Sequence, residues 1–167
     1  PSPLEVSGKR AESVKDWETI RPLVADMMQK CEYGYLPPKP EKVSFEITET
    51  DNRFCASKAT YCKVEITSVI NGEKFTFPVS YVYPSEGTKF KTFVHINFRP
   101  EVPDKYMPTE EIIDNGFAVA SFNYEHVQPD GDKAENYFAV FKGGLGEKYF
   151  CGQKREKTQL GKVGTCR

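Results

Sequence analysis

The sequence lacks the features that would place it in several specialised classes of protein. Its 167 residues contain no run of about 20 apolar residues, so nothing predicts a membrane-spanning helix. Positive and negative charges nearly cancel, with 23 Lys and Arg against 24 Asp and Glu, which removes any overall attraction to nucleic acid or anionic lipid. Neither G-x-x-x-x-G-K-[ST] nor G-x-G-x-x-G is present. We therefore expect no membrane, no nucleic acid and no cofactor as partner.

The sequence has few cysteines, and their spacing shows no paired motif. The five cysteines are odd in number and form no C-x-x-C motif; they are Cys31, Cys55, Cys62, Cys151 and Cys166. This usage favours reduced structural thiols and thus a soluble protein of the cytoplasm. The chain opens on Pro1 rather than Met, so a secreted protein whose leader has been removed stays open as the alternative, and the compartment is left undecided.

A complete catalytic set for hydrolysis is also missing. No serine lies in the nucleophile elbow G-x-S-x-G. Histidine occurs twice: His95 falls inside an apolar stretch, which favours a structural role, whereas His126 follows an apolar stretch, where α/β sheets place ligands. His126 and Asp130 are therefore candidates for a ligand-binding loop, and an ordinary loop capped by aspartate explains them equally well. We expect no metal site and assign no catalytic residue.

The first part of the chain reads as an arm followed by a helix. Residues 1–12 carry two prolines and a glycine and predict an extended N-terminal arm. Between Ser13 and Cys31 the apolar residues recur at spacings of three and four, which is typical of one buried helical face. Ser13 followed by Asp16 is a helix-start signal, and Pro22 predicts a second helical segment or a kink. We expect residues 13–167 to form a single α/β domain.

The next segment predicts antiparallel strands. Val43, Phe45 and Ile47 alternate with polar residues, which predicts a half-buried strand. Two further alternating runs flank Asn71-Gly72, a dipeptide suited to the positive backbone angles of a tight hairpin.

Two denser apolar runs follow. The runs Phe90–Phe98 and Phe117–Tyr124 predict strands covered on both faces, and a short helix signal from Pro108 to Ile113 separates them. A buried strand, a helix and a buried strand within this length predict a parallel βαβ unit. The fold class is therefore α/β, with antiparallel N-terminal strands followed by a parallel βαβ unit.

Several segments together resemble a known family, the α/β-hydrolase carbohydrate esterases related to glucuronoyl esterases and acetyl xylan esterases. The resemblance covers roughly residues 14–164. It rests on the segments Trp17–Pro22, Tyr33–Pro37, Val94–Phe98, Asn115–Ala120, and the stretch from Tyr124 to Pro129-Asp130. The first two resemble the family's opening helix, and the others resemble two of its core strands.

The resemblance implies the N-terminal part of a serine esterase acting on plant-polysaccharide esters, with a partial hydrolase-like sheet. In that family a serine attacks the ester carbonyl, a histidine takes its proton and a carboxylate orients the histidine. No residue of this chain matches any of the three, so the domain is expected to be incomplete and inactive alone. Asn97, Phe98 and Arg99 follow the first core strand, where such enzymes build the oxyanion wall, and are candidates for a pocket edge.

Two further expectations follow. An incomplete sheet would leave the flank of the Phe90–Phe98 strand unpaired, which predicts self-association through that edge. The alternative to an esterase portion is a non-catalytic α/β module that binds carbohydrate or protein through the aromatic residues Tyr33, Tyr35 and Tyr106.

Overall fold

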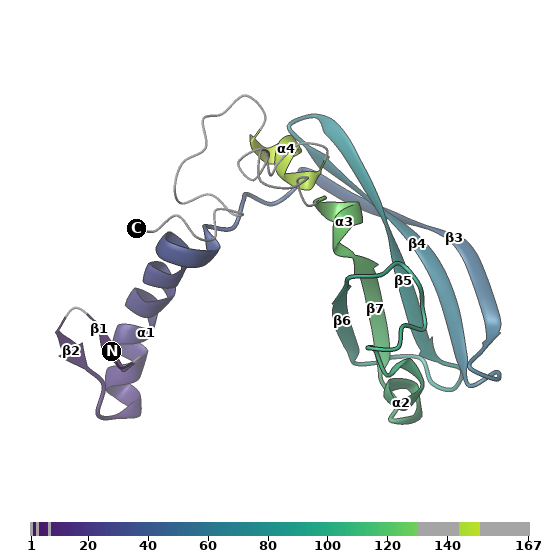
Figure 1. The fold of residues 1–167 in the computed structure, drawn as a ribbon, viewed down its shortest axis with the longest axis horizontal. Helices are drawn as coiled ribbons and strands as arrows, with labels where there is room; N and C mark the ends of the chain where they lie inside the picture. The colour runs from purple at the N-terminus through teal and green to yellow at the C-terminus, as the bar shows by residue number, and fades with distance from the viewer. Residues whose placement is uncertain (1, 3, 7, 130–143, 151–167) are drawn as a thin grey trace. The chain divides into compact units, whose positions relative to one another are not determined.

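The computed structural model describes residues 2, 4–6, 8–129 and 144–150, which belong to two compact units (Figure 1). Among the described residues, the first unit ends at Pro38 and the second begins at Lys39. An N-terminal arm of residues 1–12 and one domain over 13–167 stay predictions. None of the helices in the described ranges is both long enough and apolar enough to cross a bilayer.

The first unit opens with a small hairpin and continues into a helix. Strands β1 (Glu5–Val6) and β2 (Lys9–Arg10) pair antiparallel, and Gly8 beside the turn has a φ of 72°. Helix α1 (Val14–Met28) then begins at a capping box: the backbone N of Asp16 donates to Ser13 Oγ, and the Ser13 backbone N donates to the Asp16 carboxylate.

Helix α1 runs through Pro22 as one helix, so a second helical segment beginning at Pro22 is wrong. The helix continues into a π-helical segment, η1 (Gln29–Tyr33), which is followed by Gly34. Gly34 has a φ of 74°, in the left-handed region where a glycine carries no side-chain clash.

The second unit is built on a five-stranded mixed sheet. Its strands are β3 (Lys42–Phe54), β4 (Ala59–Ile70), β5 (Glu73–Pro84), β6 (Thr92–Asn97) and β7 (Ala118–Asn123). Their order in the sheet is β3-β4-β5-β7-β6. The β6 and β7 strands pair in parallel, and every other neighbouring pair is antiparallel. A mixed sheet with a few helices is thus confirmed.

Local sequence signals account for the connections. Asn71 and Gly72 take φ values of 51° and 76° in the tight turn between β4 and β5. Helix α2 (Thr109–Asp114) lies in the crossover from β6 to β7 and is followed by Gly116 at a φ of 77°. Two short helices complete the unit, α3 (Tyr124–Val127) and α4 (Leu145–Phe150).

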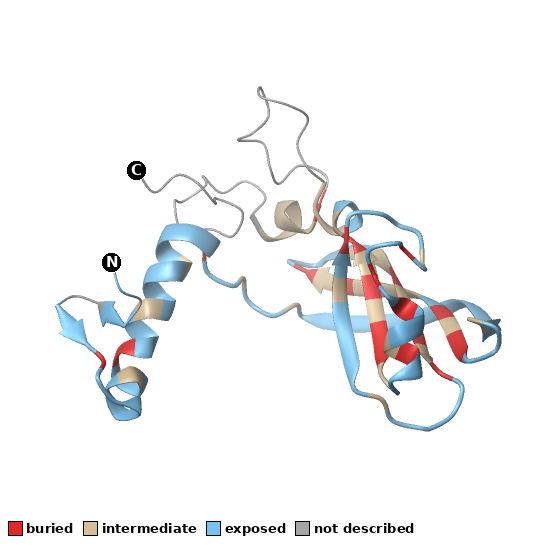
Figure 2. Cartoon of the chain, turned by 60° about the horizontal axis from the view of Figure 1, so that its bottom comes forward, coloured by how far each residue is buried: buried red, intermediate tan, exposed pale blue. Residues whose placement is uncertain are grey.

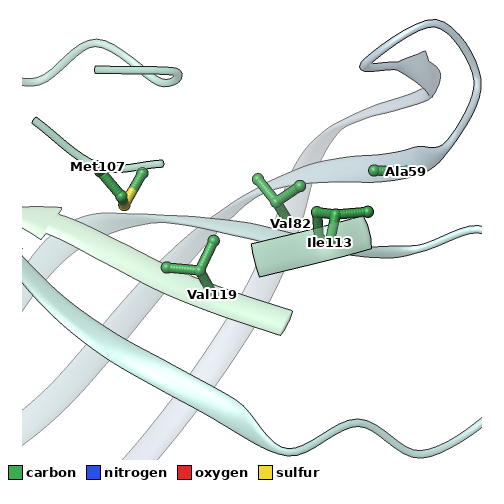
Figure 3. Packing of buried hydrophobic residues seen from close by; sticks show 5 residues of the cluster. All are labelled: Ala59, Val82, Met107, Ile113 and Val119. Carbon is green, nitrogen blue, oxygen red and sulfur yellow. The ribbon is translucent and has the colours of Figure 1, made fainter. Parts of the chain in front are cut away.

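One face of the sheet is covered by α2 and the loop before it; we call it the covered face. Its core cluster consists of Ala59, Val82, Met107, Ile113 and Val119. Figure 3 shows Ile113 of α2 and Met107 of the loop beside Val82 and Val119 of the sheet. Burying each such side chain stabilises the fold by roughly 1.5–3 kcal/mol, so this small cluster is what fixes α2 on the sheet.

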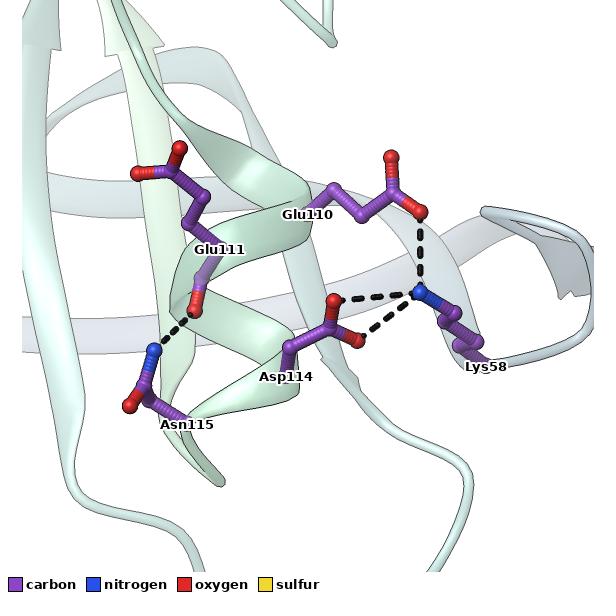
Figure 4. Close-up of polar contacts among 5 residues, drawn as sticks. All are labelled: Lys58, Glu110, Glu111, Asp114 and Asn115. Atoms are coloured by element: carbon purple, nitrogen blue, oxygen red, sulfur yellow. Dashed lines mark hydrogen bonds and ion pairs between the residues drawn. The ribbon is translucent and has the colours of Figure 1, made fainter.

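Helix α2 is also tied to the turn between β3 and β4. Lys58 Nζ lies 3.0 Å from carboxylate oxygens of both Glu110 and Asp114 (Figure 4). The two acids hold the pKa of Lys58 above its ordinary value, Glu110 contributing most. All three groups are exposed to water, so the cluster orients α2 more than it stabilises it.

The opposite face of the sheet is apolar and uncovered; we call it the bare face. The prediction that the Val43–Ile47 strand is half-buried is wrong, since Val43, Phe45 and Ile47 are 59%, 74% and 55% exposed. They line a groove of about 590 Å³ whose floor is formed by apolar side chains of β4 and β5. The cartoon coloured by burial shows strand β3 as exposed along nearly all of its length (Figure 2). The alternation is real, but no described element packs on this side.

The prediction that the Phe90–Phe98 strand is covered on both faces is also wrong. The strand begins at Thr92 and ends at Asn97, and among the described strands β6 is an edge of the sheet with β7 as its neighbour. Val94 and Ile96 are 73% and 61% exposed. By contrast, β7 lies between two strands and is buried except at Ala120 and Phe122, which are half-buried on the bare face, so cover on both faces is wrong for β7 as well.

Candidate functional site

The carboxyl ends of the two parallel strands are built alike. Asn97 and Asn123 are register partners at the last positions of β6 and β7. Each side-chain oxygen accepts a hydrogen bond from the backbone N two residues later, at 3.2 Å from Arg99 and at 2.8 Å from Glu125. Both bonds are Asx turns, which bend the chain away from the sheet as soon as the strand ends. The chain therefore leaves the sheet through the same kind of turn at the ends of β6 and β7.

An aromatic pair follows these asparagines. Phe98 and Tyr124 contact edge to face, with ring centroids 5.3 Å apart. Phe98 is nonetheless 82% exposed, so it forms a rim over the strand ends rather than part of the core. An exposed aromatic ring held by a second ring can pack against an apolar ligand surface at little cost in side-chain entropy.

Arg99 is held by its neighbours in the loop after β6. Its guanidinium lies 3.2 Å from the Asp104 carboxylate, which is buried, and 4.6 Å from the centre of the Tyr106 ring. The Tyr106 phenol, followed by Asp104, raises the pKa of Arg99 above its ordinary value. The same contact, together with Lys105, lowers the pKa of Tyr106. Arg99 is thus positioned as a fixed cation facing the strand ends.

A polar cavity of about 220 Å³ lies between this loop and the covered face of the sheet. Arg99 and Asn123 contribute to its wall at the strand ends, and His126, on the exposed side of α3, closes one side. Glu49, Lys63 and Ser80 line it from the antiparallel strands. Side chains from the loop after β6, from the end of β7 with α3, and from the antiparallel strands therefore line one cavity.

The predicted site residues have different outcomes. Asn97, Phe98 and Arg99 lie at the end of β6, and Arg99 and His126 line the same cavity. Asp130 lies outside the described residues, so its pairing with His126 stays a prediction. In the described part of the chain, no group of three potential metal-ligating side chains is found.

The cavity offers binding groups rather than a nucleophile and its base. Ser80 and Ser121 face each other across β5 and β7. Ser80 Oγ shares a hydrogen bond of 3.3 Å with the Tyr61 hydroxyl. Among the described residues, His126 makes no hydrogen bond to either serine, so neither has the adjacent base that nucleophilic catalysis requires.

Asn97 carries one unusual feature. Its Nδ2 group is buried and has no hydrogen-bond partner among the described residues. An unpaired buried amide costs about 1–3 kcal/mol, so such groups are uncommon in folded proteins. A hydrogen-bond acceptor from outside the described part of the chain would satisfy the Asn97 Nδ2 group.

Sequence reasoning missed several residues of this site. Asn123 and Tyr124 could have been found, because Asn-Tyr at the end of β7 repeats the Asn-Phe at the end of β6. Glu49, Lys63 and Ser80 carry no local signal, since they meet only through strand register.

Comparison with known proteins was made on sequence and on structure. No protein-family model and no curated protein matches the chain by sequence. A glucuronoyl esterase from Solibacter usitatus matches by structure with a TM-score of 0.74 and 20% identity, over 96% of this chain and 48% of that one. The CE15 glucuronoyl esterase from Teredinibacter turnerae gives 0.72 and 19%, over 96% of this chain and 42% of that one.

A third structure is more distant but holds a ligand. The glucuronoyl esterase from Sporotrichum thermophile, in complex with methyl 4-O-methyl-β-D-glucopyranuronate, matches with a TM-score of 0.50 and 20% identity, over 77% of this chain and 29% of that one. In all three cases the chain spans less than half the length of the esterase. The family resemblance seen in the sequence is therefore confirmed at the level of fold: the chain shares the fold of part of a CE15 glucuronoyl esterase.

Proposed function

We propose that this chain forms the front part of a serine esterase domain that acts on plant-polysaccharide esters. One observation carries the proposal: 96% of the chain superposes on a glucuronoyl esterase, of which it spans 48%. An acetyl xylan ester is retained as a second substrate class within the same proposal.

We propose that the nucleophile, acid and base of this esterase come from residues outside the present sequence. The sequence has no G-x-S-x-G elbow, and His126 has no serine partner among the described residues. In the hydrolase arrangement, the strand bearing the nucleophile pairs beside Phe90–Phe98. No described strand pairs with the outer side of β6, which leaves that side available for the nucleophile strand.

The strand ends fit a role as the wall of a substrate pocket, which sharpens the proposal for Asn97, Phe98 and Arg99. The backbone N of Arg99 already donates to Asn97 Oδ1, so it is not free to act as an oxyanion donor. The wall function therefore falls to the exposed Phe98 ring and to the Arg99 guanidinium, which has five N–H groups and spends only some of them on Asp104.

The alternative is a non-catalytic module that binds carbohydrate or protein through aromatic residues. One observation favours it: Tyr33, Tyr35 and Tyr106 are 55%, 40% and 67% exposed. Tyr35 is held by a hydrogen bond of 2.8 Å from its hydroxyl to Asp26, so it is already oriented.

An ester-hydrolysis assay tests whether the chain alone is inactive, and the coding sequence past residue 167 separates the two functions. We expect the 167-residue chain to release no methanol from methyl 4-O-methyl-β-D-glucopyranuronate above the buffer rate, because it lacks the nucleophile. Turnover by the purified chain that survives His126→Ala would overturn the proposal. Reading the coding sequence past residue 167 gives the second arm: we expect an elbow, an acid and a histidine in that order, and their absence would favour the binding module.

A further inference from the structure

We infer that the polar cavity of about 220 Å³ at the strand ends binds a small oxyanion of the phosphate and sulfate class. The inference concerns binding by the described residues and does not rest on the proposed ester chemistry. It starts from the two asparagines that end the parallel strands.

The two Asx turns engage the acceptor of each asparagine and leave its donor over. Asn97 Oδ1 accepts from the backbone N of Arg99, and Asn123 Oδ1 accepts from the backbone N of Glu125. The buried Nδ2 group of Asn97 has no partner among the described residues. Asn123, its register partner, lines the cavity. An amide nitrogen donates and does not accept, so these groups call for a ligand that brings oxygen acceptors.

Three further donors of the cavity lining are basic side chains. Lys63 of β4 is exposed and forms no ion pair within the described part of the chain. Arg99 has five N–H groups and spends only some of them on Asp104 and Tyr106. His126 adds an imidazole from α3. Hydrogen bonds from charged donors to an oxyanion are the strong ones, so these side chains favour a negatively charged ligand.

The lining holds a single carboxylate, that of Glu49, against Lys63 and Arg99. Glu49 is the register partner of Lys63, yet the two side chains form no ion pair in the described ranges. Asp104 is not part of the lining, and both of its carboxylate oxygens are engaged, one by Arg99 and the other by the backbone N of Tyr106. The groups that face the cavity therefore favour an anion over a cation.

The placement of the donors points to an anion with oxygens in several directions. Tyr61 and Lys63 reach the cavity from β4, Ser80 from β5 and Asn123 from β7, while Arg99 reaches it from the loop after β6. A tetrahedral oxyanion offers acceptors to all these sides, whereas a carboxylate offers two oxygens in one plane. The volume also suits a small ion, because sites for larger ligands measure about 300 to 1,000 Å³.

Four sodium salts test the inference at constant ionic strength: phosphate, sulfate, D-glucuronate and methyl phosphate. Isothermal titration calorimetry on the full 167-residue chain measures each dissociation constant. We expect about 1 mM for phosphate and for sulfate, and at least about fivefold weaker binding for the carboxylate of glucuronate. Methyl phosphate separates two sources of the bound group: binding equal to that of phosphate points to a phosphate ester, and weaker binding points to the free anion.

Two pairs of matched variants locate the site. Lys63→Met should weaken phosphate binding about fivefold, because it removes a cation from the lining. Lys42→Met, at an exposed position of β3 outside the lining, should leave binding unchanged. Glu49→Gln should have the opposite sign and strengthen phosphate binding about threefold, because it removes the carboxylate. Glu46→Gln, on the same strand but outside the lining, should change nothing.

A fifth variant tests the asparagine donors. Asn123→Asp keeps the oxygen that accepts from the backbone N of Glu125 and replaces the Nδ2 donor with a second oxygen. It should abolish phosphate binding, with urea unfolding confirming that the variant is folded.

Three results would each overturn the inference: glucuronate binding as tightly as phosphate, no saturable phosphate binding up to about 20 mM, or equal effects of Lys63→Met and Lys42→Met. Because none of these measurements involves ester turnover, they can fail while the esterase proposal stands.

Discussion

Both faces of the five-stranded sheet carry apolar side chains, but the two faces meet different surroundings. On the covered face, Val82 and Val119 are buried beneath Ile113 of α2. On the bare face, Phe45 and Val94 remain mostly exposed beside a long apolar groove. Each strand supplies both faces by alternation, so the difference arises from the elements that pack on them. The side-chain pattern thus shows which face of a strand is apolar, and burial of that face depends on whether another element packs against it.

The largest effect should come from the association state. We propose that the chain self-associates through β6 and the bare face, with an apparent mass at least twice the 19.0 kDa of one chain by light scattering. The double variant Val94→Lys with Ile96→Lys places two like charges on β6 and should give the mass of a single chain.

The control for this prediction is Ser44→Lys, which adds a charge to an exposed position of β3 away from β6. It should leave the association state unchanged. A monodisperse monomer of the unmodified chain over a wide concentration range would defeat the prediction.

A smaller effect should separate two isoleucines, one on each side of the sheet. Ile113→Ala should lower the free energy of unfolding by about 3 kcal/mol, because it leaves a cavity in a packed cluster. Ile47→Ala should lower it by less than about 1 kcal/mol, because that side chain is already 55% exposed. Urea unfolding of both in the double-lysine background makes the comparison on monomers. Equal losses would mean that the bare face is covered in solution.

The smallest effect should come from Lys58, which ties α2 to the β3–β4 turn. Its folded pKa is raised, so its contribution is fully present below the ordinary lysine pKa of 10.5 and is lost as the pH rises through the raised value. Lys58→Met should reduce stability slightly at pH 7, and the difference from the unmodified chain should vanish at high salt and at strongly alkaline pH. Lys89→Met, at an exposed loop position, provides the control; an equal loss there would rule out a specific role for Lys58.

Local structure was largely predictable from the sequence. The Ser13–Asp16 capping box, the Asn71-Gly72 turn and the helix ahead of Gly116 each depend on residues a few positions apart. Such signals act through backbone angles and short hydrogen bonds, which the sequence specifies directly. Burial was predicted less well, because an edge strand and a central strand can carry the same apolar run, as β6 and β7 do.

In the candidate site, too, some residues could be predicted from local sequence and others could not. Arg99 and His126 could be predicted because each follows a core strand, and the ends of parallel strands converge. The lining residues Glu49, Lys63 and Ser80 could not, because they meet through two strand registers and a β-bulge between Ile47 and Glu49. A bulge moves every later side chain to the other face while leaving the sequence pattern almost unchanged.

The two edges of the sheet differ in charge, and this sets how far an assembly could grow. Five of the residues in β3 are charged, namely Lys42, Glu46, Glu49, Asp51 and Arg53, whereas β6 contains no Lys, Arg, Asp or Glu. Charged edge strands resist pairing with another chain, so β6 is the edge of each sheet that can pair and β3 is the edge that resists pairing. When two β6 strands pair about a twofold axis, both uncharged edges are buried and only the charged β3 edges stay exposed. Association by this route ends in a closed dimer rather than a growing fibre.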